Sequence, residues 1–141
     1  PIQNPLPILV GTGGPRMSRI TAMHAEEWNT WGDVKGASER LATIRRACES
    51  IDRDPATLRT SAQALFFLVD DAATAKKFAE RASAERPMIV GDAHQIAAAL
   101  ASYGEAGFDE IIIPDFALGA TPSARREMYE RFATDVLPLV S

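Results

Sequence analysis

With 141 residues, the chain is long enough to form one domain with a hydrophobic core and too short for two such domains. Hydrophobic residues make up 46% of the sequence, a share that excludes a mainly disordered chain. The net charge of -4, without a basic cluster, argues against nucleic acid as a partner. We therefore expect a single domain over residues 1–141.

The sequence favours a protein of the cytoplasm. Cys48 is the only cysteine, so no disulfide can form within the chain, and its place on an apolar helix stripe predicts a core position. No run approaches the ~20 apolar residues that span a bilayer, and the start PIQNPLP lacks the features of a signal peptide. This start also lacks Met and is typical of the interior of a longer chain that leads to a strand.

The first 30 residues predict a strand, a glycine-rich turn, a helix and a second strand. The apolar run at residues 8–10 does not alternate with polar residues, which is typical of a strand buried on both faces of a parallel sheet. Pro15 fits the first turn of a helix, where its missing N–H loses no partner. A second strand follows, centred on Trp28. The turn Gly11-Thr12-Gly13-Gly14 is therefore expected to lead into a helix N-terminus.

The residues alone leave two interpretations of this turn open. A helix N-terminus with bare backbone N–H groups binds anions, and Arg16 would add a guanidinium suited to phosphate. The alternative is a tight turn that uses glycine only for its backbone angles. The turn is not the dinucleotide fingerprint G-x-G-x-x-G, because position 16 is Arg, and no Gly-Lys-Ser/Thr follows as in a Walker loop.

Helices and strands alternate through the rest of the chain. Apolar residues recur at helical spacing over residues 37–51, and the apolar run within residues 60–69 predicts a strand. Asp92 is a suitable N-cap, and the apolar residues 88–91 before it are expected to form a connector. The remaining predicted elements are a helix over residues 72–84, a helix from Asp92 to the glycines at 104 and 107, a strand at 111–113 and a last helix from about residue 123 to Pro138.

This order of elements predicts an α/β fold with a parallel sheet, either a barrel or an open sheet. Four β/α units are half of an eight-stranded TIM barrel. A parallel sheet of four strands would by itself leave two strand edges without a partner. An unrelated open sheet, such as a small phosphate-binding domain, is an alternative that requires a strand order unlike that of consecutive barrel strands.

The stretch PILVGTGGPRMSRITAMHAEEWN resembles a segment that recurs in the bacterial luciferase-like monooxygenase family. Later segments agree with the family in their order: the Arg- and Ala-rich helix that ends with Asp52-Arg53-Asp54-Pro55, the strand that ends with Asp70-Asp71, Val90-Gly91-Asp92 before a helix, and the run GEAGFDE before the last strand. The resemblance covers nearly all of residues 6–140. It implies the second half of a TIM barrel, strands five to eight, with the first half missing, removed or carried by another polypeptide.

The family uses reduced flavin or the deazaflavin coenzyme F-420, so the resemblance implies coenzyme F-420 or FMN as cofactor and a small organic substrate. It implies that the cofactor phosphate is surrounded by Gly11, Thr12, Gly13, Gly14 and Arg16. It also implies that Trp28 walls the ring pocket and that Asn29 hydrogen-bonds the ring or the substrate. The alternative for this pair is a core tryptophan followed by an asparagine turn.

The other candidate residues have weaker claims. Trp31 would line the pocket from a loop, and Glu27 is expected to be a structural hydrogen-bonding group. His24 at the end of a helix and His94 in a first helical turn are expected at the surface, while Asp115 either faces the site or forms a turn. The sequence has no metal-ligand spacing and no Ser-His-Asp or Cys-His set, so it assigns no metal and no catalytic residue.

Two functions from different classes follow. The first is part of a flavin- or deazaflavin-dependent oxidoreductase or monooxygenase, to which this chain contributes the cofactor-phosphate loop and part of the ring pocket. The second is a non-catalytic half-barrel, either a fragment or a binding module that associates with itself. The expected partners are a flavin-type cofactor, a small-molecule substrate and either a second copy or a missing N-terminal half; neither a nucleic acid nor a membrane is expected.

Overall fold

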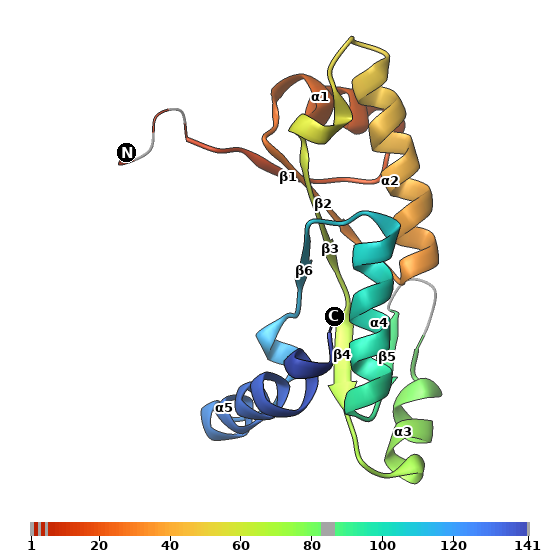
Figure 1. Cartoon of the computed structure of the whole chain (residues 1–141), viewed down its shortest axis with the longest axis vertical. Helices are drawn as coiled ribbons and strands as arrows, with labels where there is room; N and C mark the ends of the chain where they lie inside the picture. The colour runs from red at the N-terminus through yellow and green to blue at the C-terminus, as the bar shows by residue number, and fades with distance from the viewer. Residues whose placement is uncertain (1, 3, 5, 83–86, 141) are drawn as a thin grey trace.

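The computed structural model describes residues 2, 4, 6–82 and 87–140. It shows parallel strands with most of the helices along one side and the last long helix on the other (Figure 1). Its first elements are β1 (Leu9–Gly11), α1 (Pro15–His24), β2 (Glu27–Trp31), α2 (Val34–Glu49) and β3 (Arg59–Gln63). They are followed by β4 (Leu65–Leu68), α3 (Ala72–Ala79), β5 (Met88–Gly91), α4 (Ala93–Ala106) and β6 (Glu110–Ile112). The last elements are the short 3-10 helix η2 (Asp115–Ala117) and α5 (Pro122–Arg131), which continues through a π-helical stretch, Phe132–Val136, to the 3-10 helix Leu137–Leu139.

Four of the strands form one parallel sheet in the order β1-β2-β3-β6. The four strands follow one another across the main sheet in their chain order, as neighbouring strands do in a barrel, and only the separate pair β4 and β5 intervenes in the chain between β3 and β6. The alternative of an unrelated open sheet required a different order and is therefore wrong. The strands β4 and β5 form a separate parallel pair.

Two predicted elements differ from the structure around this pair. The strand expected over residues 60–69 is interrupted at Ala64, so that β3 belongs to the main sheet and β4 continues beyond its carboxyl end (Figure 1). The expectation that residues 88–91 form a connector is wrong, because Met88 pairs with Leu65 and the pairing extends along all of β5. An apolar run this short acquires its conformation from a partner strand that is distant in sequence.

The helices begin close to the predicted caps. The Asp92 carboxylate accepts a hydrogen bond from the Gln95 amide, and the Gln95 side chain accepts one from the Asp92 amide, which makes a complete capping box. Gly107 ends α4 in the left-handed conformation that favours glycine, with a φ of 94°. The predicted helix over residues 72–84 is shorter in the structure, where α3 ends at Ala79; residues 83 and 84 lie outside the described part.

The hydrophobic core lies between the main sheet and the helices α1, α2 and α4, and it extends to β4 and to the residues that follow α5. It confirms the predicted apolar faces of α2, α4 and the last helix. Large side chains of the core are Trp28 of β2, Leu41, Ile44 and Cys48 of α2, Phe66 of β4, Ile96 and Tyr103 of α4, and Phe132 and Val136 after α5.

The first strand is less buried than the sequence predicted. Ile8 and Leu9 are 49% and 51% exposed, while Val10 packs against the core. Among the described residues, β1 is an end strand of the sheet, so only one of its edges and only its helix-facing side have neighbours. The expectation that residues 8–10 are buried on both faces is therefore wrong for this chain.

Candidate functional site

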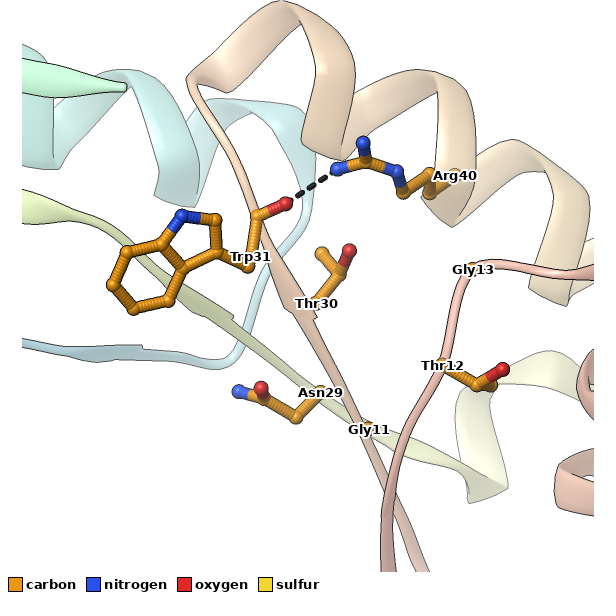
Figure 2. Close-up of a pocket in the computed structure, with 7 residues that line it drawn as sticks. All are labelled: Gly11, Thr12, Gly13, Asn29, Thr30, Trp31 and Arg40. Carbon is orange, nitrogen blue, oxygen red and sulfur yellow. Dashed lines mark hydrogen bonds between the residues drawn. The ribbon is translucent and has the colours of Figure 1, made fainter. Parts of the chain in front are cut away.

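The carboxyl ends of β1 and β2 border a hollow of about 380 Å³, which we call the loop hollow (Figure 2). It is lined by Gly11, Thr12, Gly13, Asn29, Thr30, Trp31 and Arg40. The parallel register aligns Gly11 with Asn29, so the loop after β1 and the end of β2 form neighbouring walls. Ligands of parallel α/β proteins bind at this end of the strands. The structure thus brings together Gly11, Thr12, Gly13 and Asn29, which the sequence predicted for the site. Trp31 also lines the hollow, from the end of β2 and not from a loop as expected, whereas Gly14 is not among the lining residues.

The loop after β1 leads into the N-terminus of α1 without a side-chain cap. Gly14 is the N-cap residue and makes no side-chain hydrogen bond to the helix. The first hydrogen bond of α1 runs from the Ser18 amide to the Gly14 carbonyl, at 2.9 Å. The N–H groups of Arg16 and Met17 therefore have no acceptor within the helix, which leaves them for solvent or an anion.

Glycine in this loop is not required by the backbone conformation. Positive φ is absent from residues 11–14. A Cβ built at Gly13 would lie 3.7 Å from the Arg40 side chain, an ordinary contact, and one built at Gly14 would meet no atom within 4 Å. The interpretation of a turn that needs glycine only for its backbone angles is therefore wrong. The space beside the bare backbone instead fits the close approach of a ligand.

Arg40 of α2 brings a positive charge to the loop hollow. Its guanidinium donates a hydrogen bond to the Trp31 carbonyl, and its side chain passes next to Gly13 (Figure 2). Arg16, the residue that the sequence predicted for this role, is exposed in the first turn of α1 and does not line the hollow. Sequence reasoning missed Arg40 because no short-range spacing connects it with residues 11–14; the contact depends on how α2 packs along the sheet.

Trp28 lies in the core and not in the loop hollow. Its side chain is 1% exposed, and its ring stacks with Phe108 at a centroid distance of 6.4 Å. The indole Nε1 donates a hydrogen bond to the Thr12 carbonyl, at 3.0 Å. The expectation that Trp28 walls a ring pocket is corrected to the alternative, a core tryptophan. Trp28 acts on the site indirectly, because its hydrogen bond to the Thr12 carbonyl holds the glycine-rich loop from the core side.

Asn29 is held by a hydrogen-bond network on the face of β2 opposite to the one that carries the Trp28 side chain. Its Nδ2 donates to the Ser61 Oγ at 3.0 Å, and that hydroxyl donates to the Glu27 carboxylate at 2.7 Å. This network gives Glu27 the structural role that the sequence predicted. It also fixes the orientation of the Asn29 amide, which points to the same side of β2 as the Trp31 ring (Figure 2).

The turn from β2 into α2 is fixed by hydrogen bonds from two other elements. The Gly32 amide donates to the Gln63 carbonyl at 3.0 Å, and the Gly32 carbonyl accepts from the Tyr103 hydroxyl at 2.8 Å. Tyr103 is fully buried, and burial, together with the negative charge of Asp33, raises its pKa to about 12. These bonds hold Trp31, at the end of β2, beside the hollow.

The other candidate residues lie outside the loop hollow. His24 at the end of α1 and His94 at the start of α4 are exposed, as predicted. Cys48 is buried in the core, and this burial raises the pKa of its thiol. Asp115 forms an ion pair with Arg125 at 3.2 Å. Within residues 2, 4, 6–82 and 87–140, no three metal-ligating side chains come together, and no helix is long and apolar enough to cross a membrane.

Known proteins resemble the chain in both sequence and fold. A family model described as luciferase-like monooxygenase matches residues 1–87, whereas no curated protein matches the chain. The coenzyme F-420 dependent tetrahydromethanopterin reductase from Methanopyrus kandleri is 14% identical, with a TM-score of 0.69 over 98% of this chain and 52% of its own. Riboflavin lyase RcaE, solved with modified FMN and the substrate riboflavin, is 14% identical, with a TM-score of 0.69 over 94% of this chain and 42% of its own. Monooxygenase RslO1 from Streptomyces bottropensis is 21% identical, with a TM-score of 0.66 over 96% of this chain and 48% of its own.

The chain spans about half the length of these three structures. Its parallel sheet of alternating strands and helices matches about half of a luciferase-like TIM barrel. The predicted fold class is thereby confirmed.

Proposed function

Because the chain belongs to the luciferase-like monooxygenase family, we propose that it forms half of an oxidoreductase or monooxygenase that uses coenzyme F-420 or FMN. Its substrate is a small organic molecule. The structures of similar fold include one described as coenzyme F-420 dependent and one that contains modified FMN, which supports a cofactor of this kind. When bound, the cofactor supplies the redox chemistry, and the protein supplies binding, orientation and electrostatics.

The glycine-rich loop is assigned to the phosphate of the cofactor. One observation carries this assignment: Gly11, Gly13 and Gly14 lack side chains where neither positive φ nor packing demands glycine. A phosphate can therefore approach the backbone closely and accept hydrogen bonds from the first turn of α1. The Arg40 guanidinium adds a permanent positive charge at the same hollow.

The end of β2 is assigned to the cofactor ring. The Asn29 amide is oriented by Ser61, and no described residue donates a hydrogen bond to its oxygen, which can therefore accept one from a ligand. The Trp31 ring, on the same side of the strand, offers an aromatic surface for stacking (Figure 2). Trp28 and Tyr103 position these groups from the core through their hydrogen bonds to Thr12 and Gly32.

A comparison of FMN with riboflavin tests the assignment, because the two differ in the phosphate. We expect the 141-residue chain to bind FMN more tightly than riboflavin in a fluorescence-quenching titration. The substitution Gly13→Leu places a side chain in the approach path and should weaken FMN binding by about tenfold or more. Gly104→Ala is the matched control, since a Cβ at this position of α4 meets no atom within 4 Å and lies outside the hollow.

Equal affinities for FMN and riboflavin, or a Gly13→Leu variant that binds FMN like the wild type, would contradict the phosphate assignment. The same titration carried out with coenzyme F-420 and its dephosphorylated fragment shows which cofactor the hollow prefers. Circular dichroism of each variant confirms that the fold is retained.

A non-catalytic half-barrel that associates with itself is a second candidate. The observation that favours it is the exposed apolar surface at β1, where Leu6, Ile8 and Leu9 are 64%, 49% and 51% exposed. Apolar surface of this kind marks an interaction site. Light scattering on the titrated samples separates the two candidates. A dimer without affinity for FMN or coenzyme F-420 supports the second, and cofactor binding supports the first.

A further inference from the structure

A second hollow, of about 300 Å³, lies between β4, α3 and the segment from η2 to α5. We call it the aromatic hollow. Figure 1 shows these elements at the opposite end of the molecule from α1. Every residue that lines it is apolar or glycine, and the lining includes Phe66, Phe67, Phe78, Ala117 and Met128. This composition differs from that of the loop hollow, which is lined by glycine, polar side chains, Arg40 and the single aromatic side chain of Trp31.

One wall of the aromatic hollow is rigid and the other is accessible. Phe66 is 1% exposed and packs against Tyr103 of the core, with the ring centroids 6.5 Å apart. Phe67 and Phe78 are half-buried, and their rings stack at a centroid distance of 4.4 Å. Ala117 is also half-buried and is the residue that η2 contributes to the lining. A ligand would therefore reach aromatic surface without unfolding the core.

The apolar surface continues past the stacked pair. A neighbouring hollow of about 360 Å³ shares Phe67, Phe78 and Ala117 with the aromatic hollow. It adds Phe116, which is 60% exposed, and it is apolar except for Arg81. Joined concave apolar surfaces of this size are typical of small-molecule sites. Aromatic side chains favour a flat ring that can stack on them or contact their edges.

The aromatic hollow also lies at a suitable place relative to the loop hollow. The strand β4 follows β3 after a single residue, and the Gln63 carbonyl of β3 holds the Gly32 amide beside the loop hollow. Phe67 comes four residues after Gln63, which corresponds to about 13 Å along the strand direction. An elongated molecule seated on Phe67 can therefore extend toward the carboxyl end of the main sheet.

We propose that the aromatic hollow binds the apolar, ring-containing body of the substrate, so that the enzyme acts on aromatic compounds in preference to small polar ones. The assignment of this ligand as substrate rests on the proposed function, in which the loop hollow holds the cofactor. Binding of an aromatic ring at this place does not depend on the cofactor and can be measured alone.

The test is a titration of the 141-residue chain with 2-naphthol, followed by the fluorescence of the ligand. We expect saturable binding to the wild type. Ala117→Phe fills the hollow from η2 and should weaken binding by about tenfold or more. Ala120→Phe adds the same ring at an exposed position that does not line the hollow, and it should bind 2-naphthol like the wild type.

A second variant keeps the test informative if Ala117→Phe fails to fold. Phe78→Leu keeps an apolar side chain but removes the ring that stacks on Phe67, and it should also weaken 2-naphthol binding. The inference is overturned if the wild type shows no saturable binding or if neither Ala117→Phe nor Phe78→Leu reduces it. FMN affinity, measured on the same samples, should be unchanged in both variants. A chain that binds 2-naphthol but neither FMN nor coenzyme F-420 would contradict the proposed function and retain the aromatic site.

Discussion

The loop hollow and the aromatic hollow are built by different means. The loop hollow is shaped by backbone at the ends of β1 and β2, and buried side chains of the core hold its carbonyl groups. The aromatic hollow is shaped by side chains of β4, α3 and η2, and the last residue of α5, Arg131, forms a surface ion pair with Asp70 in the segment between β4 and α3. The difference teaches that the loop hollow is coupled to the stability of the fold through core hydrogen bonds. In the aromatic hollow Phe66 belongs to the core, whereas the half-buried residues Phe67, Phe78 and Ala117 can change with less cost to the fold.

The largest effect of this coupling is expected at Trp28. Trp28→Ala leaves a cavity in the core and releases the Thr12 carbonyl, so we expect the free energy of unfolding to fall by about 3–5 kcal/mol. Urea unfolding followed by circular dichroism measures it. Trp31→Ala is the matched control, because the same side chain is only half-buried there, and it should cost less than half as much. Equal losses for the two tryptophans would mean that the core does not hold the loop hollow in the way described.

A smaller effect, which depends on pH, is expected at Tyr103. In the folded protein its hydroxyl keeps its proton up to a pKa of about 12, whereas an unfolded tyrosine loses it near 10. The unfolded state therefore binds fewer protons above pH 10. The stability that this group contributes is complete below pH 10 and is lost as the pH rises to about 12, by about 2–3 kcal/mol in total.

Comparison with Tyr103→Phe isolates this contribution from other groups that titrate at high pH. The variant loses the hydrogen bond to Gly32, which should cost about 1 kcal/mol at neutral pH. Its unfolding free energy should then fall less steeply than that of the wild type above pH 10, so that the two curves approach each other. Parallel curves from pH 8 to 11 in urea titrations would show that Tyr103 does not stabilise the turn beside the loop hollow.

The parts of the fold that depend on nearby residues could be predicted from the sequence. The apolar face of α2, the Asp92 cap of α4 and the order of the β/α units follow from spacings of a few residues. The features that could not be predicted depend on contacts between segments that are far apart in the sequence. The strand β5 exists because β4 lies beside it, and the exposure of Leu9 follows from the position of β1 at the end of the sheet.

The candidate site could also be predicted only in the parts that depend on nearby residues. The glycine-rich loop and Asn29 are close in sequence to the ends of their strands, so their place in the site followed from the strand assignment. The face that each tryptophan occupies did not follow, because Trp28 and Trp31 lie three residues apart and only the register of β2 decides which one enters the core. Arg40 was missed for a related reason, since its guanidinium reaches the loop hollow through the packing of α2.

The smallest effect is expected at the ion pair beside the aromatic hollow. Asp70 is 75% exposed, its contact with Arg131 measures 2.8 Å, and Arg131 keeps a second carboxylate partner in Asp135 at 3.6 Å. Asp70→Asn should therefore lower the free energy of unfolding by less than about 1 kcal/mol at low ionic strength, and salt should reduce the difference further. Urea unfolding of the wild type and the variant, at low salt and at about 1 M NaCl, measures both effects. A loss comparable to that of Trp28→Ala, or one that persists in high salt, would show that the wall of the aromatic hollow is as tightly coupled to the fold as the loop hollow.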